Sequence, residues 1–174
     1  STGNAFNFGS LTESKRGVSD GVSNSTRGIF GGGQTDLPSS VNTIEYVTLA
    51  SLGNAVRFGD LSTIKRNISG CASPTRGIFA GGYVTPTSLI PFNVIEFITI
   101  ASTGNSIRFG DLTQRRVSMG AVSSSIRGVF AGGYTSPTSV NTIDYITIAS
   151  TGNAINFGSL TEIGRAHVWT PVTS

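Results

Sequence analysis

The octet Arg127-Gly128-Val129-Phe130-Ala131-Gly132-Gly133-Tyr134 decides the fold that the sequence predicts. Its first half is short and apolar, and a glycine pair then interrupts it. This pattern is typical of a buried strand that runs into a tight turn. Glycines allow positive φ angles and close backbone approach at such a turn. Two earlier copies of the octet occur, at residues 27–34 and 76–83.

Other short motifs recur with the octet in a fixed order. The pairs Gly-Asn and Phe-Gly each occur in four equivalent places, with successive spacings of 50, 51 and 48 residues. An acidic residue followed by an aromatic one occurs as Glu45-Tyr46, Glu96-Phe97 and Asp144-Tyr145. A repeat of this length indicates one structural unit that is used three times.

Each repeat divides into four short segments with the composition of β-strands. The third segments are apolar on both sides, which predicts a neighbour on each face, because a solvated antiparallel sheet alternates more cleanly. Residues 4–11 match the fourth segment, so the chain is expected to start in a fourth strand. The first strands are predicted to begin near Arg16, Arg66 and Arg116, the octets are the second strands, the third strands span 42–50, 93–101 and 141–149, and the fourth span 54–61, 105–112 and 153–160.

Four strands in about 50 residues is the pattern of a β-propeller blade. We therefore expect an all-β chain, a partial β-propeller with three four-stranded blades at about 12–61, 62–112 and 113–160, preceded by one strand in residues 1–11. A parallel β-helix is the alternative, but its coils are usually shorter than this repeat. Propellers close with about 4 to 8 blades. Residues 1–162 are thus expected to be a fragment whose terminal blades contact neighbouring blades of the full-length chain or self-associate.

The repeats resemble the kelch family of β-propeller repeats over residues 1–162. The resemblance lies in the Gly-Gly after the second strand and in the aromatic residue of the third strand. The repeats depart from kelch in the fourth strand, where Phe58, Phe109 and Phe157 stand in place of the usual tryptophan.

The sequence of the repeat is also similar to repeats in predicted virion and tail-associated proteins of aquatic tailed phages. The similar segments are, in chain order, Arg-Gly-Val-Phe-Ala-Gly-Gly-Tyr, Asn-Thr-Ile-Asp-Tyr-Ile-Thr-Ile and Phe-Gly-Asp-Leu-Thr. This resemblance implies a non-catalytic structural or host-contact role in a virion. Residues 163–174 resemble the translation of a short sequencing adapter, so we expect a non-native tail there and leave it out of the fold.

The composition gives no case for a nucleic-acid or membrane partner. The net charge is only +3 and is spread without a Lys/Arg run. No stretch approaches the roughly 18 apolar residues of a membrane span. The single cysteine, Cys71, has no partner for an internal disulfide and aligns with Gly21 and Ala121, so we interpret it as a small core residue.

The sequence predicts neither catalysis nor a cofactor. The only histidine, His167, lies in the tail, so a copper oxidase on this scaffold lacks its histidine ligands. A turn Asp at positions 60 and 111 is replaced by Ser at 10 and 159, which makes a poor calcium site. Two alternatives remain open: a fragment of a glycan-active or oxidase propeller whose catalytic blades are missing, and a cellular kelch-type adaptor.

One basic and one acidic residue per repeat are expected to form cross-strand pairs. Arginine opens each second strand, and a carboxylate lies in each adjacent third strand. The alternative is an anion-binding ring of arginines. The predicted pairs are Arg27 with Glu45, Arg76 with Glu96, and Arg127 with Asp144.

The loop between the second and third strands varies most between repeats. Constant scaffolds with variable loops are how many binding surfaces are built. In an antiparallel blade this loop lies on the same face as the connection from the fourth strand to the next first strand. The alternative is that these loops are linkers whose aromatics cover the blade edge. We expect a protein or glycan surface to bind at Tyr83, Phe92 and Tyr134, with Arg66 and Arg116 nearby.

Overall fold

The computed structural model describes residues 3–36, 39–84 and 90–161. These residues form strands, turns and extended loops, and none of them lies in a helix. The strands assemble into three four-stranded antiparallel sheets and one two-stranded hairpin. The predicted all-β fold class is therefore confirmed.

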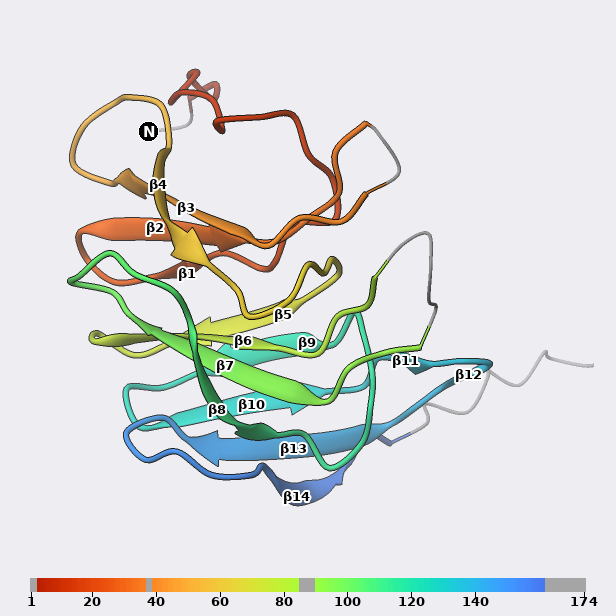
Figure 1. Ribbon diagram of the computed structural model, residues 1–174. Helices are drawn as coiled ribbons and strands as arrows, with labels where there is room; N and C mark the ends of the chain where they lie inside the picture. The colour runs from red at the N-terminus through yellow and green to blue at the C-terminus, as the bar shows by residue number, and fades with distance from the viewer. Residues whose placement is uncertain (1–2, 37–38, 85–89, 162–174) are drawn as a thin grey trace, which may run out of the picture.

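Each repeat folds as one sheet whose strands follow one another in chain order from edge to edge. We call these sheets units 1, 2 and 3, and Figure 1 shows them stacked one upon the next. Unit 1 contains β1 (Val22–Ser23), β2 (Arg27–Gly31), β3 (Thr43–Thr48) and β4 (Val56–Asp60), unit 2 contains β5 (Ser69–Ala72), β6 (Arg76–Ala80), β7 (Val94–Thr99) and β8 (Ile107–Asp111), and unit 3 contains β9 (Gly120–Ser123), β10 (Arg127–Ala131), β13 (Thr142–Thr147) and β14 (Ile155–Ser159).

The octet forms the second strand of each sheet, as predicted. In unit 1, β2 pairs with β3 from Arg27 opposite Thr48 to Gly31 opposite Ile44. The strand ends there because Gly32 and Gly33 have φ angles of 65° and 115°, a region that favours glycine. A Cβ atom at Gly32 would collide with the carbonyl oxygen of Lys65. The glycine pair thus lets the next connection pass close to the strand end.

The hydrophobic core lies between the sheets. Neighbouring units approach each other along their first strands, where the Oγ of Ser69 donates to the carbonyl of Met119 at 2.8 Å. Two equivalent clusters fill the first junction, between units 1 and 2, and the second junction, between units 2 and 3. The first cluster includes Val22, Phe58, Leu61, Phe79, Ile98 and Ile100, and the second includes Cys71, Phe109, Leu112, Phe130, Ile146 and Ile148.

The recurring Phe-Gly and Gly-Asn pairs meet at the outer edge of each junction. At the first junction, the amide of Gly104 donates to the carbonyl of Phe58 at 2.9 Å. The side-chain oxygen of Asn105 accepts from the amide of Asp60 at 3.0 Å. Gly59 must lack a side chain because a Cβ atom there would collide with the carbonyl of Gly104. Each junction joins a Phe-Gly pair of one unit to a Gly-Asn pair of the next unit, so both motifs recur with the repeat.

The start of the chain differs from the prediction. Residues 4–11 were expected to form a fourth strand, but the described residues 3–11 contain no strand. They still hold the place of one, since the carbonyl of Phe8 accepts from the amide of Gly53 at 2.9 Å and the amide of Ser10 donates to Asn54 at 3.0 Å. A fourth strand needs a third strand beside it, and no described segment provides one here.

Unit 3 carries one addition that the repeat did not predict. The loop after its octet folds into a hairpin of β11 (Tyr134–Thr135) and β12 (Thr138–Ser139). In unit 2, the corresponding loop contains residues 85–89, outside the described residues.

Candidate functional site

The three carboxylates of the third strands are buried in ion pairs. Glu45 contacts the Nζ of Lys15 at 2.8 Å, and Glu96 contacts the Nζ of Lys65. Asp144 contacts Arg116 at 2.7 Å, and both of these side chains are fully buried. Each cation comes from the connection that precedes its own first strand.

The same connection supplies hydrogen bonds to each carboxylate. The backbone amides of Thr12, Ser62 and Thr113 donate to Glu45, Glu96 and Asp144 at 2.9 to 3.1 Å. Each carboxylate thus holds the incoming connection against the sheet.

The pKa values of two carboxyl groups reflect these bonds. Burial would raise the pKa of Glu45, but the bonds from Lys15 and Thr12 outweigh it and lower the pKa below its ordinary value. Burial likewise opposes ionisation of Glu96, and the Lys65 charge with the Ser62 bonds lowers its pKa. Both groups are therefore ionised at neutral pH.

The predicted pairing of Arg27 with Glu45, Arg76 with Glu96, and Arg127 with Asp144 is wrong. Arg27 lies opposite Thr48, whereas Glu45 lies opposite Phe30. The three guanidinium groups instead stack on the aromatic rings that follow the carboxylates, at 4.6 to 4.7 Å from the ring centres of Tyr46, Phe97 and Tyr145.

Two of these arginines also join consecutive units. Arg27 donates to the carbonyl of Ile100 at 2.7 Å, and Arg76 donates to the carbonyl of Ile148 at 2.8 Å. Each acceptor belongs to the next unit along the chain. The arginines therefore fasten the junctions, and the structure gives them a structural role different from the one predicted.

The loop face comes together as the sequence predicted. Arg66, in the connection between units 1 and 2, forms a bridge with Tyr83, and Val117 forms the equivalent bridge with Tyr134. The strand connections and the loops after the octets therefore lie on one face. Tyr83 and Tyr134, both predicted to bind, border a common space there.

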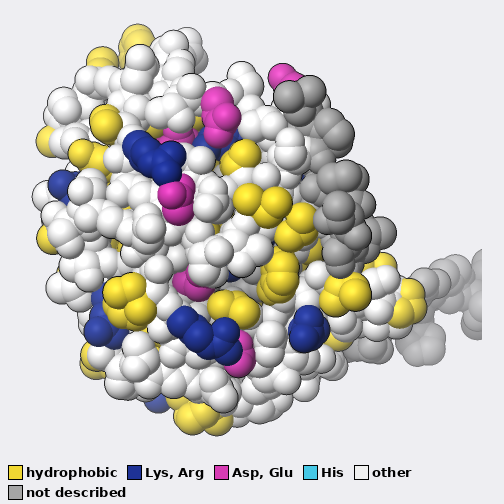
Figure 2. All heavy atoms as spheres, viewed as in Figure 1, with side chains coloured by type: hydrophobic (Ala, Val, Ile, Leu, Met, Phe, Trp, Pro, Cys, Tyr) yellow, Lys and Arg dark blue, Asp and Glu magenta, His cyan; other side chains and the backbone are white. Residues whose placement is uncertain are grey.

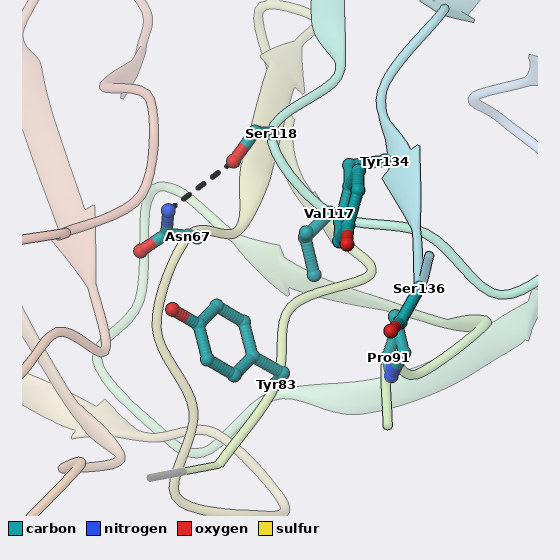
Figure 3. A pocket seen from close by; sticks show the side chains of 7 residues that line it. All are labelled: Asn67, Tyr83, Pro91, Val117, Ser118, Tyr134 and Ser136. Atoms are coloured by element: carbon teal, nitrogen blue, oxygen red, sulfur yellow. Dashed lines mark hydrogen bonds between the residues drawn. The ribbon is translucent and has the colours of Figure 1, made fainter. Parts of the chain in front are cut away.

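That space is a pocket of about 280 Å³ at the second junction. Figure 3 shows the side chains of Tyr83, Val117 and Tyr134 around it, with the hydrogen bond between Asn67 and Ser118 drawn beside them. Tyr83 is half-buried, and Tyr134 is 42% exposed. The lining residues are Asn67, Tyr83, Pro91, Val117, Ser118, Tyr134 and Ser136.

The two junctions differ at this point, where an arginine at the first corresponds to a valine at the second. At the first junction, Arg66 lies over the Tyr83 ring, 4.8 Å from its centre, and contacts Gln34 and the Tyr83 hydroxyl. At the second junction, the equivalent residue is Val117, which is too short to fill the corresponding space. The pocket is therefore the place that a guanidinium occupies one unit earlier.

The backbone beside the pocket adopts an uncommon conformation. Asn67 and Ser118 have φ angles of 54° and 53°, in the left-handed region, and glycine occupies the same turn in unit 1 as Gly17 with a φ of 58°. A non-glycine residue there costs about 1–2 kcal/mol. The Asn67 side chain donates to the Oγ of Ser118 at 3.2 Å, which links the two turns.

Three predicted binding residues do not line this pocket, and one of them, Arg66, lies over the Tyr83 ring at the first junction. Arg116 is fully buried against Asp144, so its prediction as a ligand contact on the loop face is wrong. It occupies the position of Lys65, because the two basic residues of the third repeat lie one place earlier than in the second. Phe92 is half-buried and accepts the Arg116 amide through its carbonyl, while its neighbour Pro91 lines the pocket.

Sequence reasoning missed Asn67, Val117 and Ser118, which lie next to the predicted arginines. A shift of one residue in the alignment of the third repeat hid the equivalence of Val117 with Arg66. The spacing from Leu61 to Arg66 and from Leu112 to Val117 carried that signal, since both pairs are five residues apart.

No group of three or more His, Cys, Asp or Glu side chains within residues 3–36, 39–84 and 90–161 is arranged to hold a metal ion. Cys71 is 5% exposed, which confirms it as a small core residue, and burial raises the pKa of its thiol to about 12. The strand register makes Val22 and Val122 its equivalents, so the predicted alignment with Gly21 and Ala121 is wrong by one residue. In the described part of the chain, no helix is long and apolar enough to cross a membrane.

Charges on the surface are mixed. Arg57 pairs with Asp60 at 2.6 Å on β4, and Arg108 pairs with Asp111 at 2.7 Å on β8, and both arginine side chains are exposed. Figure 2 shows basic side chains close to acidic ones on the face in view, without a broad patch of either sign.

No protein-family model and no curated protein matches the chain.

Proposed function

We propose that units 1 to 3 are blades of a β-propeller and that the chain is a non-catalytic interaction module. Support for the blades comes from the strand order within each sheet and from the close approach of the first strands, which fits strands nearest a common axis. The apolar clusters on both sides of unit 2 fit a blade that is covered by its neighbours.

The interaction site is the Tyr83–Tyr134 pocket on the loop face, and this pocket is the observation that carries the proposal. It lies in the part of the repeat that varies most, and it opens where the preceding junction is filled by Arg66. The resemblance to phage repeats supports a role in a virion or tail protein that contacts a host surface or other virion proteins.

The chemistry of the lining favours a saccharide of the host surface. Two tyrosine rings provide apolar faces and phenolic hydroxyls, and Asn67, Ser118 and Ser136 add neutral hydrogen-bonding groups. No carboxylate lines the pocket, and the Arg66 guanidinium already lies over one face of Tyr83. A cationic guest therefore finds no counter-charge, whereas a ring with hydroxyl groups finds both stacking and hydrogen-bond partners.

Saturation-transfer NMR with a panel of neutral and acidic mono- and disaccharides tests this function. The matched control is Val117→Arg, which places at the second junction the residue that fills the first. We expect transfer to at least one saccharide with the wild-type chain and its loss with the variant. No transfer to any saccharide, or equal transfer with Val117→Arg, would overturn the proposal.

A further inference from the structure

Unit 3 exposes a face that is covered in the other two units. Val122 is 68% exposed, whereas the equivalent residues Val22 and Cys71 are 1% and 5% exposed. Phe157 and Leu160 are exposed as well, although their equivalents in units 1 and 2 are buried in the junctions. Arg127 is exposed and stacks on Tyr145. We call Val122, Arg127, Phe157 and Leu160 the trailing face.

Unit 1 exposes the opposite kind of face. Leu49 is 44% exposed, whereas the equivalent Ile100 and Ile148 are 0% and 1% exposed. A hollow of about 360 Å³ lies between Phe30, Val47 and Leu49 of the sheet and the segment Phe8–Leu11. We call Gly28, Phe30, Val47 and Leu49 the leading face.

The covered junctions show how these two faces fit. At the first junction, a Cβ atom at Gly77 would lie 2.8 Å from a methyl group of Val22, so the glycine makes room for that side chain. At the second junction, Gly128 makes room for the sulfur of Cys71 in the same way. By equivalence, Val122 fits over Gly28, and Arg127 reaches the carbonyl of Leu49 as Arg27 reaches that of Ile100.

We infer that two copies of this chain close into one ring, with the trailing face of each copy on the leading face of the other. Two three-unit chains make six units, within the range of about 4 to 8 at which propellers close. Both exposed faces are then covered, and no further copy is recruited. The inference rests on the proposed propeller arrangement, but it does not depend on the ligand of the pocket.

The ring requires one strand to replace another, and the sequence of the chain is suited to this exchange. In the ring, β14 of one copy takes the place that Phe8–Ser10 holds on the other. Residues 1–13 and 150–162 differ only in having Phe6 where the later copy has Ile155. The incoming strand therefore offers the same contacts to Gly53 and Asn54 as the segment that it displaces.

Sedimentation equilibrium of the full chain between about 10 and 100 µM tests the ring. We expect a mass of about 36 kDa, twice the 18.0 kDa of one chain. A monomer throughout this range would overturn the inference, and so would a mass that keeps growing with concentration, because an open head-to-tail chain would then form.

Two variants test which faces meet. Val122→Glu and Leu49→Glu each spoil one face, so each variant alone should sediment as a monomer, and their equimolar mixture should recover 36 kDa through its one intact contact. A dimer of Leu49→Glu alone would overturn the head-to-tail arrangement, because trailing faces would then pair with each other. Leu52→Glu is the matched control, since Leu52 is 74% exposed and its equivalents Thr103 and Thr151 remain exposed beside covered junctions. It should remain a dimer.

Discussion

Two glycines that touch each other at the first junction should respond in opposite ways to the same substitution. Gly59 and Gly104 belong to the Phe-Gly and Gly-Asn motifs. A Cβ atom at Gly59 would collide with the carbonyl of Gly104 and lie 2.9 Å from the amide nitrogen of Asn105. A Cβ atom at Gly104 would meet nothing within 4 Å.

The expected cost follows from the bonds at that contact. Relief of the collision requires the two backbones to separate, which weakens three hydrogen bonds of 2.8 to 3.0 Å that join Phe58 and Asp60 to residues 104–106. Each such bond contributes about 0.5–1.5 kcal/mol net. Overpacking alone costs about 1–3 kcal/mol. We therefore expect Gly59→Ala to lower the free energy of unfolding by roughly 3 kcal/mol.

Gly104→Ala is the matched control. It should leave the free energy of unfolding unchanged or raise it by about 0.4–1 kcal/mol, because alanine restricts the unfolded chain. Urea unfolding followed by circular dichroism measures both variants, with the slope used to verify that the transition is unchanged. Equal midpoints for the two variants, or a larger loss for Gly104→Ala, would refute the reasoning.

Three further predictions concern the buried groups. Glu96→Gln leaves the Lys65 ammonium buried without its counter-charge, so it should lower the free energy of unfolding, measured in urea, by about 3–5 kcal/mol. The double variant Lys65→Met with Glu96→Gln should lose less of this free energy. An equal or greater loss in the double variant would argue against the ion pair. The lowered pKa values of Glu45 and Glu96 stabilise the folded chain above the unfolded pKa of about 4.3, and this contribution should be lost as the pH falls through the lower folded values. Urea midpoints measured from pH 7 to pH 3 test this, and a midpoint concentration that stays constant at pH values under 4 would contradict it. Cys71 should react with a thiol reagent only after unfolding, since its side chain is buried and its pKa is raised to about 12. Rapid labelling of Cys71 in native buffer would contradict its burial in the core.

Periodicity was enough to predict the sheets. The octet, its glycine pair and the β-branched, aromatic composition of the third strands are local patterns, and such patterns indicate which residues form a strand. The predicted meeting of the loop after the octet with the next strand connection followed from antiparallel geometry alone. Tyr83 and Tyr134 were found in this way.

The ion pairs were not predictable from strand order. Arg27 and Glu45 lie on adjacent strands, but they are three positions apart in register, and the aromatic ring of Tyr46 offers the arginine a nearer partner. The true partner, Lys15, folds back from a connection outside the sheet. A charge in a connection carries no sign of where its side chain points, so sequence alone favoured the arginine.

The pocket itself depends on a side chain that is too small. Its presence follows from Val117 at the place of Arg66, and a missing guanidinium has no pattern of its own in a single sequence. The equal spacing from Leu61 to Arg66 and from Leu112 to Val117, together with the register of the bridge between Val117 and Tyr134, makes the two junctions comparable.

A tandem chain tests most directly whether the units stand around one axis. Residues 13–161 joined twice in succession give six units of about 300 residues, with the first β14 in the place of Phe8–Ser10. Small-angle X-ray scattering should then give a monomer with a radius of gyration of about 19 Å, as for a closed domain of that size. An elongated particle with a clearly larger radius of gyration, or exposed ends that still associate, would contradict the account.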